Sequence, residues 1–376
     1  MSFFQINRKY LKQVDALMLI LLLAISIISV MTIYSTTRPI MSSAIHPNYY
    51  LKQLVWVLIG FIVLFIVMVY DYLWLREAGY AIYGIGIFLL VLVLVMGKSG
   101  LGAQRWLDLK IISFQPSEIF RLILVIGVSK YLSSVKSPLD KRSFLLSLLI
   151  FGIIPFILII KQPHLGTGII LFTTFFFLAL SKKIEKKLLL ILIAIALVVV
   201  PLGGKTIWKH LKDYQKNRIL AFINPEIDPK GIGYQIEQSK ITIGSGMAFG
   251  RGFLKGTQGP LKFLPEKHTD FVFSVFAEEW GFAGAMMLFG FYLIFFIRGF
   301  DTAIKAKDEF GKYLASGLTF MLFLYFLINI GMTLGMMPVV GVPIPFMSYG
   351  GTSLISNFII AGILINIRMR RLVMVY

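Results

Sequence analysis

Long apolar stretches alternate with polar connections along almost the whole chain. A helix needs roughly 20 residues to cross a hydrocarbon core of about 30 Å, and ten stretches reach or approach that length. They lie at about 14–34, 52–70, 78–96, 118–133, 144–160, 166–181, 187–204, 271–297, 313–337 and 349–367. Because they are continuous rather than alternating in polarity, they predict helices and not the strands of a closed barrel.

The composition agrees with this pattern. Hydrophobic residues make up 57% of the chain, against about 45–50% in an ordinary soluble domain, and the mean hydropathy is +0.83. The first stretch is too long for the apolar core of a signal peptide and has no A-x-A cleavage signal, so we expect it to be retained. We therefore predict an all-α integral membrane protein, with residues 1–376 forming a single polytopic domain without internal repeats.

Basic residues predict how the helices are oriented. With a cytoplasmic N-terminus, 19 of the 37 Lys and Arg residues fall on the cytoplasmic side and 7 fall in the short outside connections and segment mouths. The positive-inside rule then places both termini in the cytoplasm. The other 11 lie at about 205–270, which we predict to be a long extracytoplasmic loop between the seventh and eighth helices. Loops of this length are uncommon unless they are functional or disordered.

The charge and the cysteine count exclude several classes of function. The net charge of +19 does not indicate nucleic-acid binding, because the basic residues punctuate apolar segments instead of forming one solvated face. The chain has no cysteine, which excludes disulfides, a thiolate nucleophile and a thiolate metal site. The four histidines have no paired spacing, so a zinc site is not expected.

One acid stands where the long loop meets the eighth apolar stretch, in the run FLPEKHTDF. A carboxylate costs roughly 2.5–3.5 kcal/mol toward the bilayer centre, so Asp270 requires an explanation. It could cap a helix that begins at Phe271, or it could be a reactive group at the mouth of the membrane segment. His268 and Thr269, in the same run, are candidate substrate-binding residues.

A second group of charges lies between the third and fourth stretches, in GAQRWLDLKIISFQPSEIFR. Arg105 follows a flexible glycine stretch, and Glu118 and Arg121 are three residues apart, on one face of a helix. This pair is interpreted as a structural ion pair or as a cationic clamp for an anionic substrate, in which Glu118 orients the guanidinium group, and the two interpretations are compatible.

Two further segments are rich in helix-breaking residues. YQIEQSKITIGSGMAFGRGFLKGTQG fits neither a dinucleotide fingerprint nor a Walker loop. It is either a flexible loop or a backbone that approaches a phosphate-bearing ligand, with charge supplied by Lys240, Arg251 and Lys262. PVVGVPIPFMSYGGTS carries prolines at membrane depth and predicts a re-entrant lining on the outer side, where Ser348 and Tyr349 offer hydroxyls or are simply exposed.

These candidates gather on the outer side and would suit a lipid-linked pyrophosphate, although the residue chemistry alone establishes only an acid and cations on one side. The chain resembles the SEDS family of bacterial cell-wall glycosyltransferases over nearly its whole length. The motifs that carry the resemblance are, in this order, RWL…FQPSE, YQxxQS, IGSG, GTQG, FLPEKHTDF, EEWG and PFMSYGGTS. GTQ before FLPE and the short N-terminal tail look more like the elongation member, RodA, than the division member, FtsW.

The resemblance implies a peptidoglycan polymerase that uses lipid II. It also implies a place in the bacterial cytoplasmic membrane, an active site facing the periplasm or cell exterior, and work beside a class B penicillin-binding transpeptidase and the elongation machinery. Asp270 matches the catalytic acid of HTDF, and Arg105 and Glu118 match positions thought important in the family. Arg121 stands where the family usually has lysine. His164 stands where the family commonly has the aspartate of QPDLGT, which puts in doubt any role that needs a carboxylate there.

The implied reaction joins the 4-hydroxyl of an acceptor N-acetylglucosamine to the anomeric carbon of a donor, with inversion. Asp270 would act as general base, worth about 10²- to 10⁴-fold. Arg105, Arg121, Lys240 and Arg251, or a divalent cation such as Mg²⁺ or Mn²⁺, would stabilise the pyrophosphate leaving group. The main alternative is a lipid II flippase or transporter, since many spans with broken helices also typify transporters. A scaffold that only activates a transpeptidase is a third interpretation.

Overall fold

The computed structural model describes residues 13–37, 48–100, 103–108, 113–185, 190, 208–209, 211, 213–229, 231–256 and 267–371. Between 98 and 114, Trp106 is the one residue whose side chain is described. Most of the described chain is helical, as predicted. In chain order the helices are α2 (Ala16–Thr37), α3 (Tyr49–Val69), α4 (Leu73–Met96), α5 (Pro116–Ser134), α6 (Lys141–Ser147), η1 (Leu148–Ile153), α7 (Ile154–Lys161), α8 (Leu165–Ser181), α10 (Asp213–Ile223), η2 (Pro225–Ile227), α11 (Ile232–Ser245), α12 (Val272–Ile304), α13 (Glu309–Thr333) and α14 (Gly351–Arg370).

The predicted apolar stretches coincide with helices, except 187–204, which falls almost entirely outside the described residues. Within the described chain, seven helical segments are long and apolar enough to cross a membrane: α2, α3, α4, the continuous run α6–η1–α7, α12, α13 and α14. α8 is apolar but shorter, and α5 carries the charged residues Glu118, Arg121 and Lys130. The total of ten spans and their orientation stay predictions.

α13 and α14 form the centre of the bundle. Their apolar windows are 67% and 78% buried, against 28% for α3 and 22% for α4. Small residues allow the close contacts in this centre. A Cβ at Gly60 of α3 would lie 2.2 Å from the ring of Phe358, so α14 packs directly on the backbone of α3. The outer helices turn apolar side chains away from the protein, as lipid-facing helices do.

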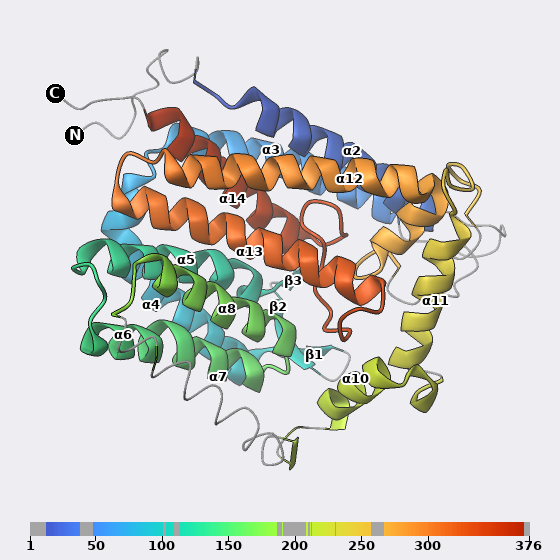
Figure 1. Ribbon diagram of the computed structural model, residues 1–376, viewed down its shortest axis with the longest axis horizontal. Coiled ribbons are helices and arrows are strands. Elements are labelled where there is room, and N and C mark those ends of the chain that lie inside the picture. The colour runs from blue at the N-terminus through green and yellow to red at the C-terminus, as the bar shows by residue number, and fades with distance from the viewer. Residues whose placement is uncertain are drawn as a thin grey trace.

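The two ends of the bundle differ. The first and last described residues, Gln13 and Arg371, line one pocket at one end. At the opposite end, α11 crosses the ends of the long helices and α10 follows below it (Figure 1). The predicted long loop at 205–270 is therefore largely built of helices where it is described. Its helix α11 is fixed by the Ser239 hydroxyl, 2.7 Å from that of Ser274 and 2.6 Å from the Thr333 carbonyl.

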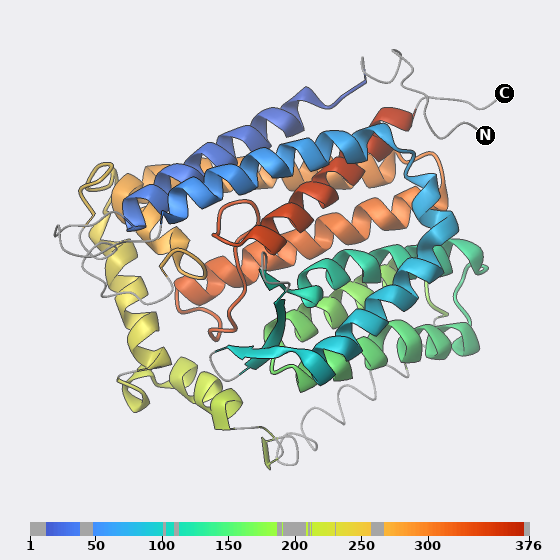
Figure 2. The same ribbon diagram turned by 180° about the vertical axis from the view of Figure 1, so that it is seen from behind.

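A small antiparallel sheet adds to the helical fold at this same end, beyond α4 (Figure 2). Its strands are β1 (Lys98–Gly100), β2 (Ala103–Asp108) and β3 (Ser113–Phe114), with β2 in the middle. The sequence did not predict it, because strands of two to six residues are too short to show a clear period.

Candidate active site

Asp270 ends a turn at 267–270 that leads directly into α12. The helix begins at Val272 with Phe271 as its cap residue, and among the described residues no side chain caps it. Asp270 is half-buried. Its backbone carbonyl accepts a hydrogen bond from Asn329 Nδ2 at 2.9 Å. This bond holds the turn against α13.

The predicted re-entrant segment lies directly against this turn. Residues 338–350 run between α13 and α14 without helical structure, and much of their apolar surface is buried. Asn329 Nδ2 also donates to the carbonyl of Val342 at 2.7 Å, which joins the segment to the Asp270 turn. Gly341 has a φ of +71°, and a Cβ built there would lie 3.3 Å from Asp270 Oδ2. The backbone at Gly341 therefore forms one wall of the space around the carboxylate.

Ser348 and His268 complete this junction. The Ser348 hydroxyl donates to the Thr269 carbonyl at 2.7 Å and accepts from the Ile344 amide at 2.9 Å, so these two bonds occupy it. The His268 ring stacks on Tyr49 of α3 at a centroid distance of 4.7 Å and contacts Tyr349 at 5.6 Å. Both residues fix the shape of the site.

Glu118 and Arg121 form the structural ion pair that the sequence left as one of two interpretations. Their side chains are 3.4 Å apart and almost fully buried. Arg121 also donates to the Glu118 carbonyl at 3.0 Å and to the Ser353 carbonyl at 3.2 Å, and its guanidinium lies 4.5 Å from the centre of the Tyr325 ring. The Arg121 side chain is fully buried. It pins α5 to α13 and α14, below the Asp270 turn.

His164 belongs to a buried polar cluster beside this ion pair. One ring nitrogen is 3.4 Å from the Ser117 hydroxyl and the other is 3.1 Å from the Thr167 hydroxyl. The adjacent Gly166 packs on the re-entrant segment, since a Cβ there would be 2.9 Å from that of Val340. The imidazole therefore stands in the place of the family's aspartate and lies within hydrogen-bonding distance of two hydroxyl groups.

The structure describes the side chains of two of the remaining predicted cations. Lys240 is exposed on α11, and its side chain passes close to Gly335. Arg251 is 40% exposed and lies 3.9 Å from the buried carboxylate of Glu278. Lys262 lies outside the described residues. Arg105 is in the middle strand of the sheet, and its side chain also lies outside what the structure describes.

Glu278 and Glu279, whose role the sequence did not predict, hold the glycine-rich segment onto α12. The helix is broken at Gly281, which has a φ of +65°. The Glu278 and Glu279 carbonyls accept from the amides of Arg251 and Gly252, each at 3.0 Å. The Glu279 carboxylate accepts from the amide of Leu254 and from Ser35 of α2. The glycines of this segment let its backbone lie close against α12. The glycine-rich motif therefore serves to pack the segment on the helix.

Sequence reasoning missed Arg218 of α10. Burial lowers the pKa of Arg218, and the negative charge of Asp270 opposes that lowering, so the guanidinium lies within electrostatic reach of the carboxylate. It was one of 11 basic residues in the 205–270 segment and belongs to no motif. No spacing could have found it, because the fold of the α10–α11 arm decides which base meets Asp270.

Fold and site together define a polytopic helical membrane protein with a half-buried aspartate at the end of the bundle away from the described chain ends (Figure 1). Comparison with known protein families gives one match over nearly the whole chain. The sequence model of the FtsW, RodA and SpoVE family, described as cell cycle proteins, matches residues 15–372. This chain therefore belongs to that family, the SEDS family, as its motifs indicated.

Named relatives fall in the elongation branch and beyond it. The peptidoglycan glycosyltransferase MrdB of Escherichia coli is 42% identical over 77% of both chains. The peptidoglycan glycosyltransferase RodA of Treponema pallidum is 30% identical over 95% of this chain and 98% of that one. Proteins named FtsW match as well.

Solved structures agree with the fold. A chain of a peptidoglycan synthase complex, described as coordinating polymerization and crosslinking, superposes with a TM-score of 0.79 at 29% identity, over 96% of this chain and 98% of that one. The crystal structure of RodA from Thermus thermophilus gives a TM-score of 0.69 at 26% identity, with the same coverage.

Proposed function

We propose that this chain is a peptidoglycan glycosyltransferase of cell-wall elongation, which polymerises lipid II with Asp270 as general base. The names of its relatives support the activity, and its position in the family supports the RodA-type role in cell shape. The observation that carries the residue assignment is the surroundings of Asp270. A half-buried carboxylate is held at its backbone by Asn329, faces the Gly341 backbone, and lies within the field of Arg218.

The chemistry follows from what a sugar hydroxyl needs. It is a weak nucleophile, and a base that removes its proton as the new glycosidic bond forms contributes about 10²- to 10⁴-fold. The Asp270 carboxylate takes that proton from the 4-hydroxyl, the anomeric carbon–oxygen bond of the donor breaks, and the pyrophosphate leaves as an anion.

The leaving group requires positive charge rather than a proton. Arg251 and Lys240, together with Arg105 and Lys262, are the basic residues of the sequence analysis that we assign to the pyrophosphate, because Arg121 is buried within the bundle. We also propose a divalent cation, Mg²⁺ or Mn²⁺, at this position. Mg²⁺ is usually bound by one or two carboxylates together with substrate phosphates. Binding by one or two carboxylates and the substrate phosphates needs no larger group of protein ligands. Among the described residues, no group of three or more His, Cys, Asp or Glu side chains could hold a metal ion.

The cellular setting follows from the same comparisons. The apolar helices and the family support a place in the bacterial inner membrane. We propose that the Asp270 end faces the periplasm or the cell exterior, where the positive-inside rule puts it. A class B penicillin-binding transpeptidase is the proposed partner, since a structural relative comes from a synthase that couples polymerization to crosslinking.

Replacing one carboxylate by its amide tests the assignment. In Asp270→Asn the backbone carbonyl that Asn329 holds is kept and the base is lost. We expect glycan synthesis from lipid II by the purified chain to fall by about 10²- to 10⁴-fold, with unchanged membrane insertion. Asp213→Asn is the matched control, because Asp213 begins α10 with a side chain 99% exposed and should keep full activity.

Near-normal polymerisation by Asp270→Asn would remove the general-base assignment. If the unaltered chain makes no glycan but moves lipid II between the leaflets of reconstituted vesicles, the flippase alternative replaces the proposal.

A further inference from the structure

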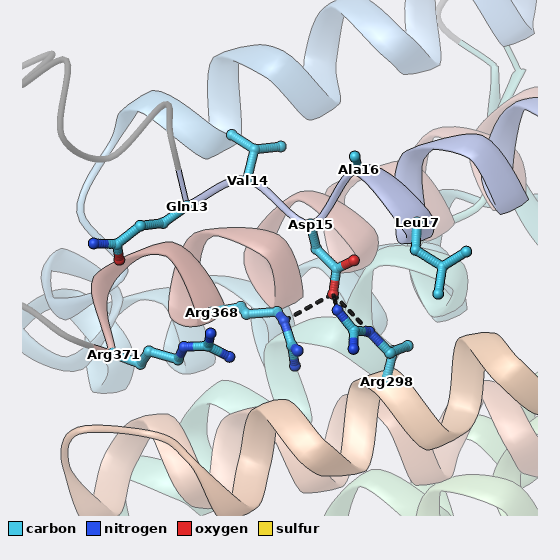
Figure 3. A pocket seen from close by; sticks show the side chains of 8 residues that line it. All are labelled: Gln13, Val14, Asp15, Ala16, Leu17, Arg298, Arg368 and Arg371. Carbon is cyan, nitrogen blue, oxygen red and sulfur yellow. Dashed lines mark hydrogen bonds and ion pairs between the residues drawn. The ribbon is translucent and has the colours of Figure 1, made fainter.

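A second cluster of charged residues lies at the opposite end of the bundle from Asp270, where α2 begins and α12 and α14 end (Figure 3). It surrounds a cavity of about 320 Å³. The lining residues are Gln13, Val14, Asp15, Ala16, Leu17, Arg298, Arg368 and Arg371. Three guanidinium groups and one carboxylate therefore line a pocket at the end of three predicted membrane spans.

Asp15 is fully engaged in holding these helices together. Its Oδ2 accepts from Arg298 Nη2 at 2.9 Å and from Arg368 Nε at 2.8 Å, while its Oδ1 accepts from the Met18 amide at 3.2 Å. The side chain is 1% exposed. Arg368 also binds Asp301 at 2.7 Å. These contacts neutralise much of the charge on Arg368, and they cannot serve the third arginine.

Arg371 is the member of the pocket in which the described residues leave a guanidinium nitrogen without a partner. Its Nη1 is buried and has no hydrogen-bond partner among the described residues. Arg298 is 32% exposed, so part of its guanidinium also remains open to the pocket. A buried donor left unmatched costs about 1–3 kcal/mol, and more when it is charged. The arrangement therefore favours an anionic acceptor that enters from outside.

We propose that this pocket binds the phosphate of an anionic phospholipid headgroup. Planar guanidinium groups match a phosphate with paired hydrogen bonds. Basic pockets between membrane helices on the cytoplasmic side are suited to such headgroups, and the positive-inside rule puts this end there. The lining adds apolar surface at Val14 and at Leu17, which is 42% exposed, next to the charges. A ligand with both phosphate and hydrocarbon matches this combination better than a free anion.

Lipid binding to the purified full-length chain tests the proposal. After delipidation, native mass spectrometry would follow the titration of phosphatidylglycerol and, separately, of phosphatidylcholine. We expect phosphatidylglycerol to bind more tightly, and Arg371→Gln to weaken it about tenfold or more, as expected for one charge-assisted contact. Arg371→Lys keeps the charge and should fall between the two. Arg142→Gln removes an exposed base from the start of α6 and should bind like the unaltered chain.

Arg371 Nη1 makes no hydrogen bond to the described residues, so Arg371→Gln loses no such contact at this atom and should fold. Equal binding of phosphatidylglycerol by Arg371→Gln and the unaltered chain would overturn the proposal, as would equal binding of the two lipids. Inorganic phosphate is the third arm. If millimolar phosphate displaces phosphatidylglycerol completely, the pocket is a site for free phosphate and the lipid assignment fails. Retention of the lipid supports it.

Discussion

Gly341→Ala is a small change that should damage the active site without unfolding it. Gly341 has a φ of +71°, a conformation that costs a residue with a Cβ about 1–2 kcal/mol. The new methyl group would lie 3.3 Å from Asp270 Oδ2. A carbon–oxygen contact this short requires the carboxylate or the segment to give by a few tenths of an ångström. The substitution thus combines a modest strain with a displaced base.

The magnitude follows from the sensitivity of proton transfer to position. A misplacement of about 1 Å can cost about 10²-fold, so a shift of a few tenths corresponds to roughly three- to tenfold in kcat. The backbone strain by itself should lower the free energy of unfolding by about 1–2 kcal/mol. Membrane insertion should be unaffected, because no charge or helix is altered.

The chain contains a matched control for the strain. Gly252 also has a positive φ, +98°, and the nearest atom to a Cβ there would be Lys255 Cδ at 3.4 Å. That atom belongs to an exposed, flexible side chain, which can move away. Gly252→Ala should therefore show a similar loss of thermal stability to Gly341→Ala, with a much smaller loss of polymerisation. Initial rates on lipid II and thermal unfolding in detergent are the two measurements.

Equal losses of activity in the two variants would refute this reasoning, because backbone strain would then explain both. Full activity in Gly341→Ala would show that the Gly341 backbone does not constrain the reacting carboxylate.

Two further predictions concern charge. Arg121→Lys should retain appreciable polymerisation, since the ammonium still faces Glu118. Arg121→Met leaves a buried carboxylate unpaired and should lower the free energy of unfolding by about 3–5 kcal/mol. Loss of activity in Arg121→Lys with unchanged stability would instead favour the substrate clamp. Chelation by EDTA should lower polymerisation, and added Mg²⁺ or Mn²⁺ should restore it. Indifference to EDTA would contradict the divalent cation.

The sequence located candidate residues and segments at the Asp270 end of the bundle, but not their contacts. Asp270 and the re-entrant segment were found because each shows locally, as an acid at a helix start and as prolines at membrane depth. For Glu118 with Arg121, spacing showed that the two could pair but not that the pair is buried. Ser348 was expected to offer a hydroxyl, yet its bonds to Thr269 and Ile344 occupy it.

By itself the sequence determined where the helices lie, because continuous hydrophobicity over a bilayer's thickness is a property of each segment alone. It did not determine which helices face lipid. α4 and α13 are both apolar, with hydropathies of 2.4 and 1.8, yet they are 22% and 67% buried. Lipid and protein core favour the same side chains, so hydrophobicity cannot distinguish them.

Only the tertiary structure decided which charges meet. Arg218 with Asp270, Arg251 with Glu278 and Asp15 with two arginines join residues distant in the chain. Such pairs depend on how helices cross and where arms fold back, which no local spacing records. The physical reason is that a charge acts over a few ångströms of space, whatever the separation along the chain.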